Sequence, residues 1–191
     1  GGFLYDATVE DKALIMFKKY WWILLLGLAL IGLIILFLPK YQTIQYEIPS
    51  TINITNTTTY NVDTMVFIAV NKVMGIDSLK VNILYNDRYF KYNRDIKAVL
   101  YQNNPKDYNL FINRTVSNRE IEVIIAHEMI HLKQYYDGIL IQKSLTDSIV
   151  YNGIKFSPTT SYNERPWERD AYTNQDIMLA KIKDLMYEKK N

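Results

Sequence analysis

The sequence contains no cysteine and only two histidines among its 191 residues. Without cysteine the chain forms no disulfide, offers no thiol nucleophile and cannot hold zinc through sulfur. Any metal ion must therefore be held by histidine, aspartate, glutamate or water. The lack of cysteine is compatible with either side of a membrane.

The chain also lacks a large excess of either positive or negative charge. The chain has 22 Lys and Arg against 20 Asp and Glu, which gives a formal net charge of +2. This balance does not favour a nucleic-acid partner, and we expect none. With 49% hydrophobic residues, seven glycines and five prolines, the sequence is neither disordered nor collagen-like. Its length suits one domain with an appendage, and it indicates no oligomeric state.

The hydrophobic residues include one unbroken run near the amino terminus, residues 21–38. About 18 apolar residues are enough for a helix to cross the hydrocarbon core of a lipid bilayer. The run therefore predicts a transmembrane helix over residues 20–38. A buried core helix would more often carry a polar stripe, and a signal peptide would have a shorter apolar core and a small-residue cleavage site.

The lysines around this run predict an orientation. Lys12, Lys18 and Lys19 precede it, whereas Lys40 alone follows nearby. By the positive-inside rule, we expect a single-pass membrane protein with a cytoplasmic amino terminus and an extracytoplasmic carboxy-terminal domain.

The predicted span divides the rest of the chain. Residues 1–19 are expected to form an amino-terminal juxtamembrane segment. Residues 39–60 are expected to form a strand and a tether rich in Ser, Thr and Asn, or an edge segment. Residues 61–191 then make up the folded domain.

Hydrophobic periodicity in residues 61–191 predicts an α+β fold with an antiparallel or mixed sheet. Apolar residues at helical spacing indicate helices over residues 63–74 and 117–138, and a last helix that starts at Pro166, keeps its apolar face to Met186 and has Lys189 and Lys190 at its carboxyl end. Strands are expected at residues 79–85, 98–101 and 108–112, and a hairpin at residues 149–156.

Local signals mark the ends of these elements. Ser117 and Glu120 have the spacing of a capping box before the second helix, and Gly138 follows its last apolar residue. Asn152-Gly153 is typical of a type I′ hairpin turn. Pro166 suits the first turn of the last helix.

Both histidines lie in the stretch HEMIH, residues 127–131. On a helix, residues i and i+4 project from the same face, so His127 and His131 can bind one metal ion. Glu128 then lies beside the open coordination position. Imidazole suits zinc, and a catalytic zinc needs three protein ligands plus a water whose pKa falls toward about 7. We expect one Zn²⁺ ion at this site, with Glu128 as the general base.

A third protein ligand is needed, and the downstream candidates are Glu164 and Glu168. Because Pro166 starts a helix, Glu168 lies in its first turn with a fixed direction. Glu164 precedes the helix on the approach to it. The sequence therefore favours Glu168.

The combination of HExxH with a later glutamate-bearing helix resembles the gluzincin metallopeptidases. Glu168-Arg-Asp-Ala171 is similar to the core of the E-x-x-A-D signature of membrane-embedded CAAX prenyl endopeptidases and related enzymes. The resemblance covers the chain from Ser117 to its end. It implies that His127 and His131 are zinc ligands, Glu128 is the general base and Glu168 is the third ligand.

The resemblance also implies a zincin-like domain. Such a domain contains a backing helix, a small antiparallel or mixed sheet, an active-site helix with HExxH and a carboxy-terminal helix with the glutamate. In the signature, the last Asp supports a ligand histidine, but this chain has Tyr172 there. We expect another group, such as Asp170 or a backbone carbonyl, to take that role. A metzincin would need a third histidine where the chain has Asp137.

These patterns predict a membrane-anchored zinc metalloendopeptidase that acts on a peptide or protein substrate. Tyr172 is the leading candidate for donating a hydrogen bond to the oxyanion, and Arg165, Tyr162 and Tyr151 are further candidates. The main alternative is a catalytically silent zincin-like module with a structural or interaction role in a membrane or virion assembly. A membrane-tethered binding protein with an accidental motif is a third possibility.

Overall fold

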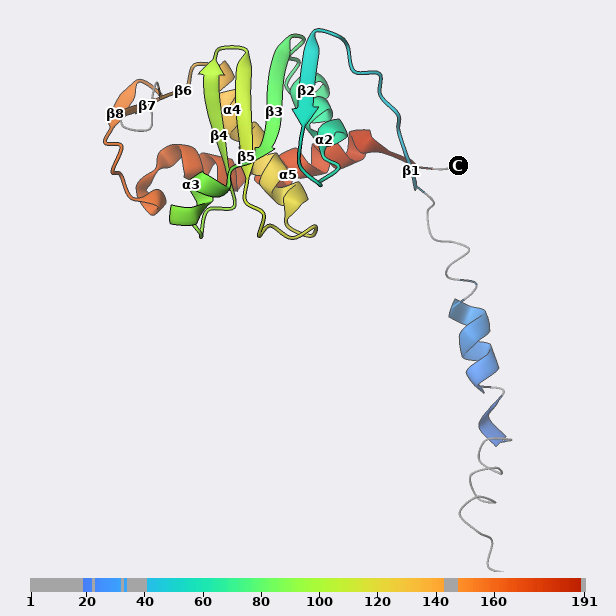
Figure 1. The fold of residues 1–191 in the computed structure, drawn as a ribbon. Helices are drawn as coiled ribbons and strands as arrows, with labels where there is room; N and C mark the ends of the chain where they lie inside the picture. Colours follow the sequence, from blue (N-terminus) through green and yellow to red (C-terminus); the bar gives the residue numbers. More distant parts are fainter. Residues whose placement is uncertain (1–18, 22, 32, 34–40, 143–147, 190–191) are drawn as a thin grey trace, which may run out of the picture. The chain divides into compact units, whose positions relative to one another are not determined.

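The protein is described by a computed structural model that covers residues 19–21, 23–31, 33, 41–142 and 148–189. The chain forms two compact units (Figure 1). The first comprises residues 1–41 and 189–191, and the second comprises residues 42–188.

The first unit corrects the expectation of a membrane span. Its helical residues are 19–21, 23–31 and 33, and the expected span's residues 34–38 lie outside the described part of the chain. Among the described residues, no helix combines the length and the apolar character that crossing a bilayer requires. A crossing needs about 20 consecutive helical residues. The predicted transmembrane helix over residues 20–38, and with it the predicted single-pass localisation, is therefore wrong.

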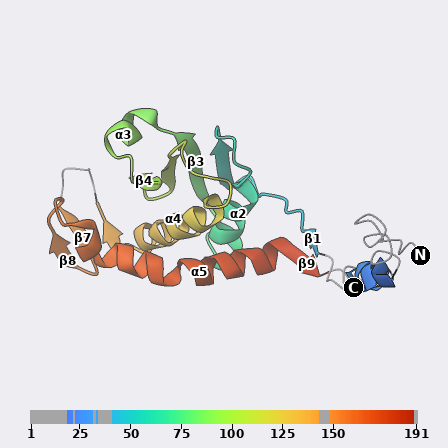
Figure 2. The ribbon, with the colours of Figure 1, turned by 90° about the horizontal axis from the view of Figure 1, so that it is seen from below.

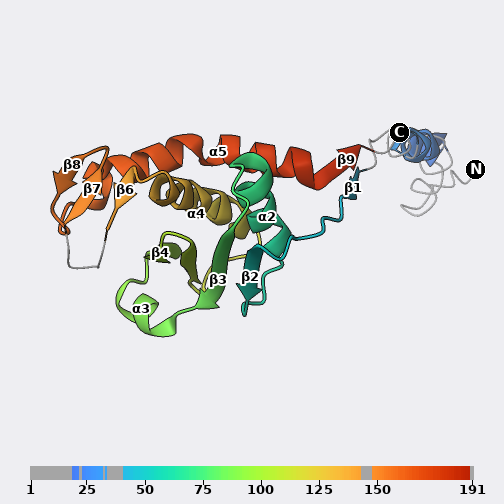
Figure 3. The ribbon, with the colours of Figure 1, turned by 90° about the horizontal axis from the view of Figure 1, so that it is seen from above.

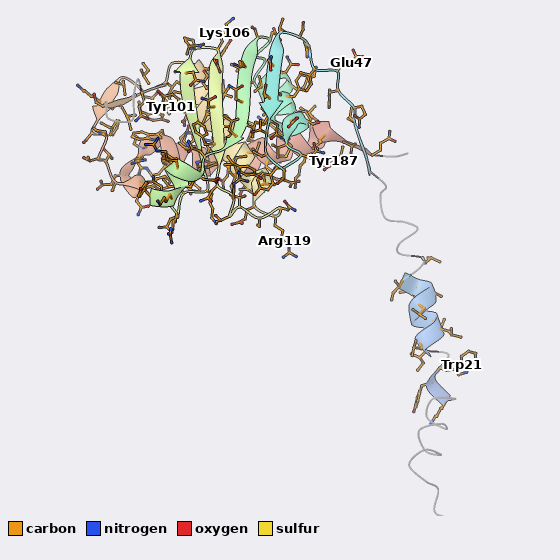
Figure 4. All side chains as sticks on the ribbon, viewed as in Figure 1. Trp21, Glu47, Tyr101, Lys106, Arg119 and Tyr187 are labelled. Atoms are coloured by element: carbon orange, nitrogen blue, oxygen red, sulfur yellow. The ribbon has the colours of Figure 1, made fainter. Side chains whose placement is uncertain are left out.

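The second unit is α+β, as expected, and is built on a mixed sheet (Figure 1). The strand order is β2-β3-β5-β4. These strands are β2 (Ile52–Asn56), β3 (Leu79–Tyr85), β4 (Ala98–Asn104) and β5 (Asp107–Ile112). Strands β2 and β5 run parallel to β3, whereas β4 runs antiparallel to β5. Strand β4 therefore forms one edge of the sheet. Figure 4 labels Lys106 in the turn between β4 and β5.

Helices cover one face of this sheet in two layers (Figures 2 and 3). The inner layer holds α2 (Asp63–Phe67), which continues as the π-helix η1 (Ile68–Val73), and α4 (Ile121–Tyr136). The outer layer is α5 (Pro166–Met186), which packs along α4. The three helices expected from periodicity are thus confirmed, but the last ends at Met186, before the expected Lys189, because residues 187–189 form a short strand.

The main core lies between the sheet and the inner helices. Strand residues alternate between buried and more exposed along β3 and β5 because successive side chains point to opposite faces. Val81 and Leu110 of the sheet and Ile125 and Met129 of α4 are fully buried in one cluster. The inward face of α4 is therefore held against the sheet.

Local residues cap α4 at both ends, as the sequence predicts. The Ser117 Oγ–H and N–H donate to Glu120 Oε2 at 2.6 and 3.0 Å, and the Glu120 N–H donates back to Ser117 Oγ at 3.3 Å. At the other end, Gly138 has φ +70°. The Ile139 N–H donates to the Gln134 carbonyl at 2.9 Å, which completes a Schellman motif.

A small second sheet lies between α4 and α5 in the sequence. Its strands are β6 (Leu140–Ile141), β7 (Ile149–Tyr151) and β8 (Ile154–Phe156), in that order. The turn at Asn152 and Gly153 has φ values of 50° and 76°, as a type I′ turn requires, which confirms the hairpin. Residues of this sheet bury Trp167 in the first turn of α5.

Residues 39–60 contain β2, which pairs with β3 at the edge of the main sheet, so residues 52–56 form an edge segment, which was one of the two alternatives expected there. Other elements were not expected. The chain also forms α3 (Asp87–Tyr92), whose cap is Asn86, and the short helix η2 (Tyr162–Glu164). Short strands β1 (Tyr41–Thr43) and β9 (Tyr187–Lys189) pair with each other.

The left-handed conformation of Gly138 generates a stability prediction. We expect Gly138→Ala to lower the free energy of unfolding by about 1 kcal/mol, because an L-residue with a Cβ is strained at positive φ. The space around the Cβ position is open, so the loss comes from the backbone and not from a clash. Urea denaturation measures it. Gly138→Asn is the matched control with a smaller loss, since Asn tolerates this conformation; equal stability of Gly138→Ala and wild type would contradict the prediction.

Candidate metal centre

Three side chains from two helices converge beside the core. His127 and His131 project from α4, and Glu168 projects from the first turn of α5. The two Nε2 atoms are 3.1 Å apart, and each lies 3.3 Å from Glu168 Oε2. Each of the three side chains offers one ligand atom, and these atoms all lie within 4.8 Å of one another. The arrangement is that of a candidate metal centre.

Packing fixes the directions of these side chains. His127 and His131 are 8% and 7% exposed because α4 is buried between the sheet and α5. Pro166 begins α5, and Trp167 is anchored under the small sheet, so Glu168 leaves the helix toward α4. The fully buried Ala171, one turn further along α5, allows the two helices to approach closely.

The partners of His131 fix its tautomer. Gln134 Nε2 donates to Asp170 Oδ2 at 2.7 Å and to the Trp167 carbonyl at 3.1 Å, so its amide orientation is determined. Gln134 Oε1 therefore faces His131 Nδ1, at 2.8 Å, and accepts a hydrogen bond from it. In the neutral ring the proton therefore lies on Nδ1, and the Nε2 atom presents a lone pair to the centre; in the protonated ring Nε2–H donates to Glu168 Oε2 instead.

His127 has a similar partner. Its Nδ1 atom lies 3.1 Å from Gln175 Oε1, which accepts a hydrogen bond from the Nδ1–H tautomer. Both histidines then present Nε2 lone pairs toward each other and toward the Glu168 carboxylate. Three such electron-rich atoms repel one another unless a cation or a proton lies among them.

The pKa values of the centre reflect this concentration of negative charge. Burial alone would raise the pKa of Glu168, but hydrogen bonds with His127 and His131 hold it well below its usual range. Burial alone would lower the pKa of His131, but its hydrogen bond with Glu168 and the charges of Glu128 and Glu168 raise it to about 9. Burial raises the pKa of Glu128, and the charge of Glu168 adds to this effect. The site thus favours positive charge.

The spacing of the three atoms fits zinc. Ligand atoms at about 2.0–2.1 Å from a tetrahedral zinc ion lie about 3.3 Å from one another. The observed separations of 3.1 to 3.3 Å are close to this value. Two imidazole nitrogens and one carboxylate oxygen are also the donor set of many catalytic zinc sites, which leave a fourth position for water or substrate.

Glu128 lies beside this cluster and is 5% exposed. Its Oε2 atom is buried and, among the described residues, has no hydrogen-bond partner. The Leu100 backbone of β4 acts on the same carboxyl group and lowers its pKa against the effect of burial. The Glu128 carboxylate therefore lies between the centre and the edge strand and retains one free acceptor atom.

The structure distinguishes between the two candidates for the third metal ligand. Glu168 joins the cluster, whereas Glu164 lies in η2, is exposed and accepts a hydrogen bond from Ser161 Oγ at 2.7 Å. Asp170 does not reach a histidine directly. Its contact with the centre passes through Gln134.

The four oxyanion candidates take different positions. The Tyr172 ring lies 4.7 Å from the His127 ring, and the Tyr162 hydroxyl donates to Glu168 Oε2 at 2.9 Å. Arg165 instead donates to the Thr160 carbonyl, and the Tyr151 ring packs near Trp167. Only the first two phenols therefore border the cluster.

Sequence reasoning missed Gln134 and Gln175. Gln134 follows His131 by three residues and Gln175 follows Glu168 by seven, so each lies on the same helix face as a ligand. That spacing is the signal that could have indicated them. It is shared by many surface residues, and only the approach of α4 to α5 distinguishes these two.

Comparisons with known proteins do not identify this chain. No protein-family model, curated protein or solved structure matches it. The function is therefore argued from the geometry of the centre.

Metal binding generates the second prediction. We expect zinc to raise the melting temperature of the full chain, because an ion bound only by the folded state stabilises it by about 2.7 kcal/mol at 100 times its dissociation constant. His127→Ala, His131→Ala and Glu168→Ala should each abolish this shift. Differential scanning fluorimetry with and without zinc measures it. Glu164→Gln is the control that should keep the shift, and its loss there would contradict the ligand assignment.

Proposed function

We propose that this chain is a zinc-dependent metallopeptidase that hydrolyses peptide bonds. His127, His131 and Glu168 are the zinc ligands, and Glu128 is the general base. The observation that carries the proposal is the buried, unpartnered Oε2 atom of Glu128 next to three converging ligand atoms. The resemblance of HExxH and E-x-x-A to the gluzincin pattern supports the same roles.

The proposed reaction is the addition of water across a peptide bond. When bound, zinc supplies a Lewis acid that lowers the pKa of water and polarises a carbonyl oxygen. Glu128 takes a proton from the attacking water, whose oxygen bonds to the carbonyl carbon. The carbon–nitrogen bond then breaks, and Glu128 returns the proton to the leaving amine. The products are a carboxylate and an amine.

Edge strand β4 offers a place for the substrate. Among the described strands, β4 pairs with β5 alone, so its other edge has unpaired backbone groups. Helix α4, which carries Glu128, packs against β4, and the Leu100 backbone of this strand acts on the pKa of the Glu128 carboxyl group. An extended peptide that pairs with β4 would pass its carbonyl groups in front of Glu128. This geometry favours an extended peptide as the substrate.

Tyr172 is the proposed donor to the oxyanion. The proton of Tyr162 is directed to Glu168 Oε2 at 2.9 Å, while its distance to the Tyr172 oxygen is 3.4 Å. In both contacts Tyr162 is the donor, so the Tyr172 hydroxyl proton is available to another acceptor. Tyr172 is 54% exposed, so its hydroxyl can turn toward a bound substrate.

The role of Glu128 generates the third prediction. We expect Glu128→Gln to bind zinc as wild type does and to lower the hydrolysis rate by about 10²–10⁴-fold, since an amide cannot accept the proton. Quantitative proteomics of a cell lysate treated with either protein identifies the cleaved peptides. Glu122→Gln is the matched control on the same helix, where Glu122 pairs with Lys183 at 2.7 Å and lies away from the centre. Equal cleavage by Glu128→Gln and wild type would refute the base. No cleavage by wild type would favour a silent module.

The two phenols generate the fourth prediction. We expect Tyr172→Phe to lower kcat by about 10²–10³-fold with little change in KM, as loss of an oxyanion donor does. Tyr162→Phe should instead weaken zinc binding, because it removes the hydrogen bond to the ligand oxygen of Glu168. Steady-state kinetics on a peptide identified by the proteomic experiment, with zinc titrations, separates the two effects. A kcat for Tyr172→Phe near that of wild type would rule out this donor.

A further inference from the structure

Gln134 makes three hydrogen bonds around the metal centre. One is with the ligand His131, and two are with the turn of α5 that carries the ligand Glu168. The Gln134 Oε1 atom accepts from His131 Nδ1 at 2.8 Å. Its Nε2 atom donates to Asp170 Oδ2 at 2.7 Å and to the Trp167 carbonyl at 3.1 Å. Trp167 and Asp170 lie on either side of Glu168 along α5. One side chain on α4 therefore contacts a ligand histidine and the helix turn that carries the ligand carboxylate.

The chemistry of the three partners requires an amide at this position. An amide has one acceptor oxygen and two N–H donors, and here the oxygen meets a donor while the nitrogen meets two acceptors. A carboxylate at position 134 would accept from His131 but would face Asp170 and the Trp167 carbonyl with no proton to donate. A neutral apolar side chain would leave all three partners without this contact. Gln134 is 3% exposed, so water does not readily replace it.

Asp170 extends the chain of hydrogen bonds and is itself held in place. Its Oδ1 atom accepts from Asn174 Nδ2 at 2.9 Å, which orients the carboxylate so that Oδ2 faces Gln134. The negative charge of Asp170 polarises the amide and strengthens the bond to His131. The order of the relay is thus Asn174, Asp170, Gln134 and His131.

From these contacts we infer that Gln134 is a positioning residue of the metal centre. It holds His131 in the Nδ1–H tautomer, with Nε2 free for the ion, and it fixes the distance from His131 to Glu168. The inference rests on the proposed zinc site and deepens it. The group that supports the histidine comes from α4 itself, so Tyr172 at the last position of the E-x-x-A-D signature does not leave His131 unsupported.

Gln175 provides the matched comparison. It contacts His127 Nδ1 at 3.1 Å, and no other hydrogen bond of its side chain is found among the described residues. Gln175→Met therefore removes an amide from a ligand histidine together with the hydrogen bond that this amide makes between α5 and α4. Gln134→Met removes an amide from the other ligand histidine and two hydrogen bonds from α4 to α5, with little change in side-chain volume.

The first experiment measures zinc affinity of the full chain by competition with a chromogenic chelator. We expect Gln134→Met to bind zinc about 10–100-fold more weakly than wild type, as is usual when a group supporting a ligand is lost. We expect Gln175→Met to cause a smaller loss of zinc affinity. A Gln134→Met affinity within twofold of wild type, or a larger loss for Gln175→Met, would overturn the inference.

The second experiment observes the histidine tautomer in the metal-free full chain at a pH well above 9, because the raised pKa of His131 keeps a proton on both ring nitrogens at neutral pH. Long-range ¹H–¹⁵N correlation spectra should show His131 with its proton on Nδ1 in wild type and as a mixture of tautomers in Gln134→Met. A purely structural role for Gln134 would leave the tautomer unchanged, and that result would overturn the inference. Neither readout depends on peptidase activity. If wild-type protein binds no zinc, the proposed function fails together with the inference; if wild type and Gln134→Met bind zinc equally, only the inference fails.

A rescue experiment covers the case in which Gln134→Met does not fold. Gln134→Glu places a carboxylate against Asp170, so we expect weaker zinc binding than in wild type. Adding Asp170→Asn supplies an N–H donor to the new carboxylate and removes the repulsion. The double variant should regain most of the lost affinity, and a double variant no better than Gln134→Glu would contradict the relay.

Discussion

The convergence of three electron-rich atoms is the constraint on which the site depends. Two imidazole nitrogens and a carboxylate oxygen lie 3.1 to 3.3 Å apart inside the protein, where their repulsion is poorly screened. Such an arrangement requires positive charge at its centre. The packing of α5 against α4 and the binding of a cation are therefore coupled, because the ligands come from both helices and neither helix holds a complete set.

The remainder of the fold keeps these two helices in place from three directions. Beneath α4, the fully buried Ile125, Met129 and Leu132 belong to the core. At the beginning of α5, the small sheet buries Trp167, and further along this helix Ile182 joins the main core. Each anchor is apolar and lies outside the ligand cluster. Hydrophobic packing thus determines where the ligands lie, and hydrogen bonds such as those of Gln134 determine how they point.

The features that sequence predicted are those set by neighbouring residues. The capping box at Ser117, the hairpin turn at Asn152-Gly153 and the histidine spacing all depend on positions a few residues apart, and the structure contains each of them. The pairing of β2 with β3 depends on residues far apart in the sequence, and so do the contacts of Gln134 with α5, so local patterns could not reveal them. The prediction of a membrane helix was wrong because it rested only on the number of consecutive apolar residues in the sequence. Among the described residues, the helix is not long and apolar enough.

Glu128 supports the proposed catalytic role of the centre over a structural one. A structural zinc site is usually closed by four protein ligands, whereas the cluster here brings together three, with a carboxylate beside them. Burying a neutral polar atom without a partner costs about 1–3 kcal/mol and a charged one costs more, so a site that served only stability would be improved by an apolar residue there. In the proposed function this cost is offset because the oxygen has a partner during the reaction. A water molecule that must lose a proton is such a partner, and edge strand β4 next to Glu128 offers the place where a peptide carbonyl would meet it.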